Sequence, residues 1–155
     1  MVEIGKAAPD FALATDKGTV RLADYRNSWL VLYFYPKDNT SGCTKEACDF
    51  RDRMERIASH GAALLGVSPD STASHSRFAA KHSLPFVLAS DPSHEVAESY
   101  GAWGEKSMYG KKYFGIVRST FIIGPDGTVR AAWTKVSVTG HADEVIRRLE
   151  ELKAQ

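Results

Sequence analysis

The sequence predicts an α/β fold in which a central mixed sheet is flanked by helices on both faces, with a β-hairpin at the N-terminus. Three observations favour this class. Residues 29–35 are apolar at every position, which is typical of a central strand buried on both faces. Strand-like and helix-like segments alternate after it. A second hairpin pattern lies near the C-terminus, so parallel and antiparallel pairing are both expected.

The first elements are a hairpin and the central strand. Residues 11–13 and 20–22 are separated by the turn-forming triplet Asp16-Lys17-Gly18, which predicts two short antiparallel strands. The apolar strand 29–35 ends at Pro36, because proline cannot continue a hydrogen-bonded ladder.

A long helix is expected directly after this strand. Phe50, Met54 and Ile57 recur at helical spacing, and Gly61 is a natural C-terminal stop. Two oppositely charged pairs at (i, i+4) support a helix over residues 41–60. These pairs are Asp49/Arg53 and Asp52/Arg56.

The remaining elements continue the alternation, and no linker or repeat divides residues 1–155, so one domain is expected. The predicted elements are a strand at 62–67, a helix at 73–82, a strand at 85–88, a helix at 93–100, a hairpin pairing 120–123 with 129–133, and a helix at 141–152. Residues 103–118 are expected to form a solvated loop.

Composition argues against several classes of function. Lys and Arg number 20 against 19 Asp and Glu, a formal net charge of +1, which gives little electrostatic support for nucleic-acid binding. No apolar run approaches the length of about 20 residues that a membrane span needs, and the N-terminus lacks a secretory pattern. We therefore expect a cytoplasmic protein without a membrane partner. A chain of this size folds without disulfides or structural metal, which leaves both cysteines for chemistry.

Cys43 is the first candidate for that chemistry. It falls in the first turn of the helix that follows the buried strand, where free N–H groups and the helix dipole favour an anionic sulfur. Ligand sites in open α/β sheets also gather at this end of the strands. A free cysteine can equally be a small buried apolar residue, so position alone leaves both interpretations open.

The loop before Cys43 carries a family resemblance. Its pattern Pro36-x-x-x-Thr40-x-x-Cys43 resembles the active-site signature of the peroxiredoxins. Several segments are similar to the Q-type, or bacterioferritin comigratory protein, branch, namely residues 37–38, 42–52, 5–11, 103–106, 110–111 and 115–121. The resemblance covers nearly the whole chain. It implies a thioredoxin-like fold and thiol-dependent reduction of hydrogen peroxide and organic hydroperoxides, with no metal or organic cofactor.

The resemblance implies a role for six residues. Cys43 would be the peroxidatic cysteine, Cys48 the resolving cysteine of an intramolecular disulfide, Thr40 and Arg118 the groups that orient the peroxide, Pro36 the shield of the thiolate, and Glu46 the support of Arg118. Thioredoxin or a similar dithiol would recycle the enzyme, which is expected to be a monomer or at most a weak dimer. Ser41 departs from the branch, in which many members carry proline, and a slightly looser loop is expected.

Three alternatives compete with this reading. Cys43 and Cys48 could be half of a zinc site, although four ligands are normally needed and the five histidines show no ligand spacing. A thioredoxin-like oxidoreductase would normally carry Cys-x-x-Cys, which is absent. A thioredoxin-like binding module without activity is the non-enzymatic alternative. The basic cluster of residues 106, 111, 112 and 118 either attracts an acidic partner or belongs to a solvated loop. The nearby aromatic residues 103, 109, 113 and 114 either line an approach for the peroxide or pack that loop.

Overall fold

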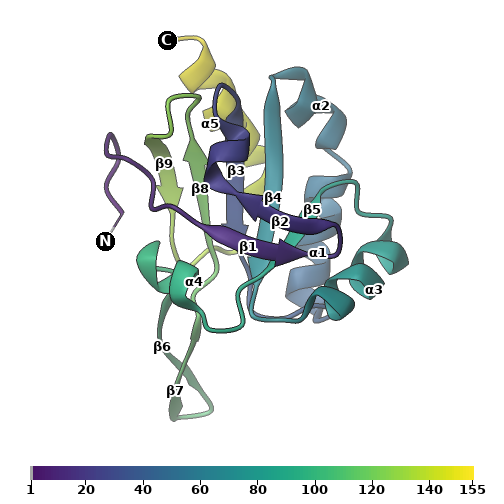
Figure 1. The fold of residues 1–155 in the computed structure, drawn as a ribbon. Coiled ribbons are helices and arrows are strands. Elements are labelled where there is room, and N and C mark those ends of the chain that lie inside the picture. The colour runs from purple at the N-terminus through teal and green to yellow at the C-terminus, as the bar shows by residue number, and fades with distance from the viewer. Residues whose placement is uncertain (1) are drawn as a thin grey trace.

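The computed structural model describes residues 2–155 and contains a seven-stranded mixed sheet in the order β2-β1-β5-β4-β3-β8-β9 (Figure 1). The sheet strands are β1 (Ala12–Thr15), β2 (Gly18–Arg21), β3 (Trp29–Phe34), β4 (Ala62–Ser68), β5 (Val87–Ser90), β8 (Ser119–Ile123) and β9 (Val129–Trp133). The helices are α1 (Ser41–Arg51), α2 (Met54–Ser59), α3 (Thr72–His82), α4 (Glu95–Ser99) and α5 (His141–Lys153), with a short 3-10 turn at Leu22–Tyr25. The predicted fold class and N-terminal hairpin are confirmed.

β3 is the central strand because both of its faces are covered. It pairs in parallel with β4 and antiparallel with β8. Val31 and Tyr33 point into one core, while Leu30, Leu32 and Phe34 point into the other, and all five are at most 1% exposed. The uninterrupted apolar run therefore reflects burial on both sides.

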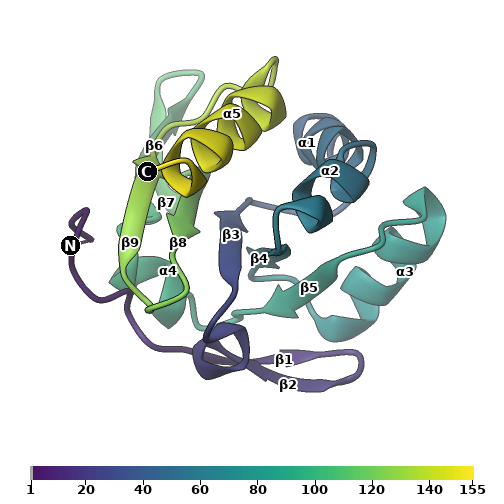
Figure 2. The same ribbon diagram turned by 90° about the horizontal axis from the view of Figure 1, so that it is seen from above.

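Helices lie on both faces of the sheet, as predicted. The core on one face contains apolar side chains of α1, α2, α3 and α5, and the other contains those of α4 and the N-terminal segment. Figure 2 shows α5, α1 and α2 together on one side of the sheet, with α4 on the opposite side. No helix within residues 2–155 is both long and apolar enough to cross a membrane.

The prediction of one helix over residues 41–60 is wrong at its middle, where α1 and α2 are separated. Arg53 has a non-helical backbone, and its guanidinium donates to the carbonyl oxygen of Asp49 at 2.8 Å. Its backbone N–H bonds to Phe50 instead. The same side chain forms an ion pair with Asp143 of α5 at 2.6 Å, so the predicted Asp49/Arg53 pair is not formed. A tertiary contact thus interrupts the helix.

The predicted charge pair Asp52/Arg56 is also wrong. Arg56 pairs with Glu150 of α5 at 2.6 Å, and Asp52 pairs with its neighbour Arg51 at 2.9 Å. The side chains of Arg53, which precedes α2, and of Arg56, within α2, therefore connect this segment to α5.

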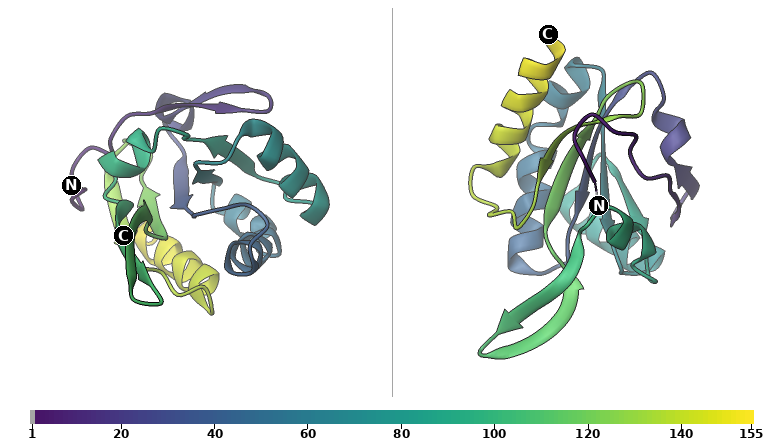
Figure 3. Two further views of the ribbon diagram at one scale, coloured as in Figure 1. Left: turned by 90° about the horizontal axis from the view of Figure 1, so that it is seen from below. Right: turned by 90° about the vertical axis from the view of Figure 1, so that its left-hand side faces the viewer.

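The prediction of a loop over residues 103–118 is also wrong. β6 (Trp103–Met108) and β7 (Lys111–Ile116) form a separate antiparallel hairpin, which projects from the body of the molecule (Figures 1 and 3). Tyr109 and Gly110 both have positive φ, 54° and 80°, as a tight two-residue hairpin turn requires. Tyr109 is 99% exposed and Phe114 66% exposed, so these two aromatic rings do not pack the segment. The other predicted boundaries fall within about two residues.

Gly66 permits close packing under the centre of the sheet. A Cβ atom at Gly66 would lie 2.9 Å from the ring of Tyr33 and 2.9 Å from Leu88 Cδ2. We expect Gly66→Ala to lower the free energy of unfolding by about 1–3 kcal/mol, because the core must shift to accept it. Gly104→Ala in β6 is the matched control, since its Cβ would meet only Val117 at 3.7 Å. Urea unfolding of both variants tests this, and equal effects would contradict it.

Candidate active site

The carboxyl end of β3 positions the candidate site. The chain leaves β3 at Phe34, turns through residues 35–40 and enters α1 at Ser41. Cys43 is the third residue of α1 and only 2% exposed. Backbone N–H groups in a first helical turn have no partner within the helix, and the dipole is positive there. The sulfur thus lies at the positive end of α1.

Arg118 reaches the sulfur from the neighbouring strand. Phe34 of β3 pairs with Ser119 of β8, which places Arg118 beside the end of β3. Its Nη2 donates to Cys43 Sγ at 3.2 Å. Gly42 leaves room for this approach, because a Cβ there would lie 3.4 Å from Arg118 Nη2. A permanent cation therefore contacts the sulfur directly.

Glu46 holds the other side of the same guanidinium. Its Oε1 accepts from Arg118 Nη1 at 2.7 Å, and the residue is 2% exposed. Burial raises the pKa of Glu46 to about 7, although the charge of Arg118 and its hydrogen bond oppose the rise. Burial alone would lower the pKa of Arg118, but Glu46 and Cys43 together raise it. The guanidinium stays charged between two acceptors.

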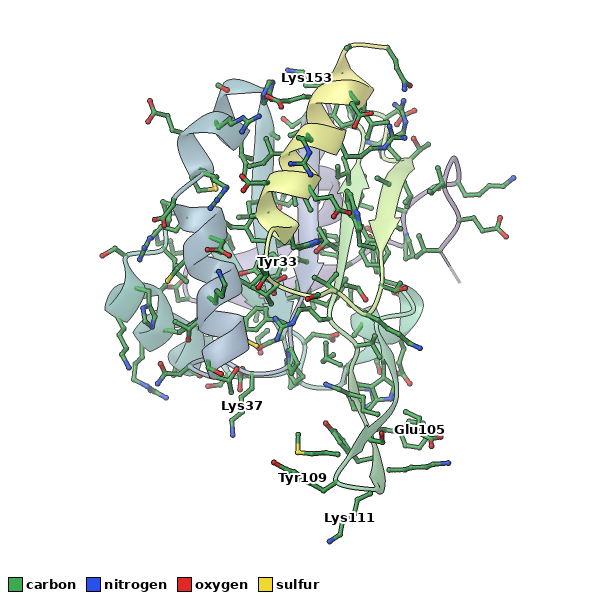
Figure 4. The ribbon with its side chains drawn as sticks, turned by 180° about the vertical axis from the view of Figure 1, so that it is seen from behind. Tyr33, Lys37, Glu105, Tyr109, Lys111 and Lys153 are labelled. Atoms are coloured by element: carbon green, nitrogen blue, oxygen red, sulfur yellow. The ribbon has the colours of Figure 1, made fainter. Side chains whose placement is uncertain are left out.

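Thr40 and Pro36 lie in the loop that leads into this helix turn. Thr40 is the N-cap residue of α1, is exposed, and donates its hydroxyl to the carbonyl oxygen of Lys37 at 2.9 Å. Because the proton points at Lys37, the free lone pairs of Oγ1 can accept a hydrogen bond. Pro36 is half-buried at the start of the loop. Figure 4 shows Lys37 pointing out of the molecule beside the lower end of α1.

The structure brings together only some of the six predicted residues by direct contact. Cys43, Glu46 and Arg118 form one contact chain. Cys48 lies on the same helix, half-buried and free, and Cys43 is also free. Thr40 and Pro36 share the loop that precedes Cys43.

Sequence reasoning missed the position of Lys106. Burial lowers the pKa of Lys106, and the nearby charge of Arg118 lowers it further. Its Nζ lies 5.8 Å from the centre of the Tyr113 ring. Lys106 therefore differs from Lys111 at the hairpin tip, which Figure 4 shows pointing away from the body together with Tyr109. Only the pairing of β6 with β7 makes this distinction, so composition could not reveal it.

Comparison with known proteins identifies the family. Residues 4–132 match the model of the AhpC/TSA family. The chain is 49% identical over 152 residues to peroxiredoxin Bcp of Bacillus subtilis, covering 97% of both chains. It is 48% identical over 149 residues to a putative peroxiredoxin bcp of Coxiella burnetii, covering 96% of this chain and 99% of the relative.

Solved structures give the same result. The bacterioferritin comigratory protein of Xanthomonas campestris, studied for its alkyl peroxide reduction activity, matches with a TM-score of 0.90 and 42% identity, over 99% of this chain and 98% of that one. PrxQ of Xylella fastidiosa matches with a TM-score of 0.91 and 39% identity over 97% of both chains. The thioredoxin-like peroxiredoxin fold and the peroxidase activity expected from the sequence are confirmed. The chain belongs to the AhpC/TSA family, within its Bcp and PrxQ peroxiredoxins.

Proposed function

We propose that Cys43 is the peroxidatic cysteine, and the contact of Arg118 Nη2 with its sulfur is the observation that carries this assignment. The thiolate attacks the terminal oxygen of a hydroperoxide and the O–O bond breaks. An alkoxide, or hydroxide from hydrogen peroxide, leaves and takes up a proton. Cys43 becomes a sulfenic acid. Hydrogen peroxide and organic hydroperoxides are both proposed substrates.

Thr40, Arg118 and Pro36 have distinct proposed roles in this step. The lone pairs of Thr40 Oγ1 accept the O–H of the peroxide, since its own proton is given to Lys37. Arg118 donates to the oxygen on which negative charge develops. Pro36 shields the sulfur from water because it presents an apolar ring and no N–H.

Cys48 is the proposed resolving cysteine. Its sulfur attacks the sulfur of the Cys43 sulfenic acid, water leaves, and an intramolecular disulfide forms. A dithiol such as thioredoxin then reduces this disulfide and is itself oxidised. We further propose that residues 1–155 act as one domain, as a monomer, in a reducing cytoplasm where such a dithiol is maintained.

The geometry of α1 limits when the proposed disulfide between Cys43 and Cys48 can form. Cys43 and Cys48 lie on one continuous helix, where five residues correspond to a rise of about 7.5 Å and a rotation of about 140°. The two Cα atoms are then roughly 8–9 Å apart on opposed faces. A disulfide requires at most about 7 Å. The first turns of α1 must therefore unwind before the two sulfur atoms can bond.

We expect Thr40→Val and Arg118→Ala each to slow oxidation of Cys43 on the order of 10²–10³-fold, because each removes one interaction with the reacting oxygens. Cys43→Ser should show no peroxide turnover. Stopped-flow single-turnover oxidation measures these rates. Arg130→Ala is a matched control, since that guanidinium lies 5.4 Å from the ring of Trp29. Oxidation rates within about threefold of wild type would show that Thr40 and Arg118 do not stabilise the reacting oxygens.

We expect the disulfide form to lose amide hydrogen-exchange protection over residues 43–49, because these turns must unwind to let the bond form. Helix α5 serves as the internal control and should be equally protected in both forms. Mass spectrometry confirms the bond between Cys43 and Cys48. Unchanged protection of residues 43–49 in a verified disulfide form would show that no unwinding takes place.

The raised pKa of Glu46 predicts a pH dependence of stability. Between pH 4.3, the usual glutamate value, and about 7, the folded protein holds a proton that the unfolded chain has lost. Stability should therefore fall as pH rises through this window, by up to roughly 3 kcal/mol. Glu46→Gln lacks this titration, so the stability of wild type relative to Glu46→Gln should fall between pH 5 and pH 8. A constant difference in urea unfolding would argue against it.

A further inference from the structure

A buried polar cluster lies against the active-site loop, and the steps proposed above do not use it. Asp38 belongs to this loop, and His75 lies in the first turn of α3. Their side chains are only 4% and 2% exposed, respectively, and Asp38 Oδ2 lies 2.7 Å from His75 Nδ1. Because both side chains are buried and in contact, they hold the active-site loop against α3.

Asp38 is held from three directions. His75 and the hydroxyl of Ser74, at 2.8 Å, both contact its Oδ2 from α3. The hydroxyl of Tyr35, just after β3, donates to its Oδ1 at 2.5 Å. The backbone N–H of Asp38 donates to Asp70 Oδ2 at 2.7 Å, in the connection between β4 and α3. These contacts fix both the side chain and the backbone of this loop position.

Both ring nitrogens of His75 face acceptors. Nε2 lies 3.0 Å from the carbonyl oxygen of Ala89, which can only accept. Nδ1 lies 2.7 Å from Asp38 Oδ2. Burial would raise the pKa of Asp38, but hydrogen bonds from His75, Tyr35 and Ser74 lower it, so Asp38 is a carboxylate that accepts these hydrogen bonds.

The same cluster has the spacing of a metal site, but its contacts argue against one. Ligand atoms of Asp38, Asp70 and His75 lie within 4.8 Å of one another. Both ring nitrogens of His75 already face acceptors of the protein, Asp38 and the carbonyl oxygen of Ala89. The contacts therefore favour a hydrogen-bonded pair.

The pair is connected to the active site through one peptide. Thr40 donates its hydroxyl to the carbonyl oxygen of Lys37, the residue next to Asp38. We infer that the His75–Asp38 hydrogen bond fixes this carbonyl and thereby the orientation of the Thr40 hydroxyl, which makes His75 a positioning residue for peroxide reduction. The inference rests on the proposed role of Thr40.

Two substitutions at His75 separate this role from simple packing. In His75→Asn the side-chain amide can take the place of Nδ1 and still donate to Asp38. In His75→Gln the longer side chain puts the amide in the place of Nε2, so the hydrogen bond to Asp38 is lost. We expect His75→Gln to slow oxidation of Cys43 by hydrogen peroxide about 10- to 100-fold, as misplacement of an orienting group does. His75→Asn should retain most of the rate. All proteins carry Cys48→Ser, so that Cys43 is the only thiol.

Two further measurements make the test specific. Alkylation of Cys43 by iodoacetamide does not need Thr40, so its rate should stay within about twofold in both His75 variants. In a Thr40→Val background, His75→Gln should cause no further loss in the peroxide rate. His141→Gln is the matched control, because His141 is similarly buried but bonds Thr120 of β8. Its peroxide rate should match that of wild type.

The outcomes distinguish this inference from the proposed function. A normal rate in Thr40→Val contradicts the role of Thr40 and the inference with it. A slow Thr40→Val with a normal His75→Gln overturns the inference alone, as do equal rates in the Asn and Gln variants or additive losses in the double variant.

Discussion

The guanidinium of Arg118 is the group on which the site depends. It is half-buried and donates to Glu46 on one side and to Cys43 on the other. Bringing this cation out of water costs free energy, which the two acceptors offset. Removing either acceptor would leave the guanidinium with only one of these two partners, so sulfur, carboxylate and guanidinium are coupled. The antiparallel pairing of β8 with β3 brings Arg118 to α1, and the sheet thus fixes the electrostatics of the helix end.

The helix that places Cys43 at its positive end also keeps Cys48 away from it. A folded first turn gives Cys43 the positive end of α1, while the same fold holds Cys48 on another face. Contacts outside the helix hold the segment at both ends. Asp38 is fixed before it by His75, and Arg53 is fixed after it by Asp143 of α5. Unwinding between these anchors leaves the rest of the fold in place, so it costs far less than global unfolding.

Much of the fold and the site could be predicted from local sequence. The apolar run of β3 and the Pro-Thr-Cys pattern each lie within one short segment of the sequence. The role of Arg118 was predicted from the family resemblance. The break between α1 and α2 could not be predicted, because it depends on Asp143, ninety residues from Arg53. The hairpin of β6 and β7 was not predicted, because much of it is exposed and its sequence lacks an alternation of apolar and polar residues. His75 meets Asp38 only through the packing of α3, which no local pattern encodes.

Ser41 affects how easily the first turn of α1 would unwind in the proposed step that forms the disulfide. It is the first residue of α1, the position at which proline is favoured because its fixed φ already suits a helix. Serine leaves the unwound chain more conformations, which lowers the free energy of unwinding by about 0.4–1 kcal/mol relative to proline. With serine the first turn would open more readily than with proline, while the contacts of Asp38 keep the loop before it in place. In the proposed resolution step, opening would then fall at the segment that separates Cys43 from Cys48, and Thr40 would stay on the anchored side.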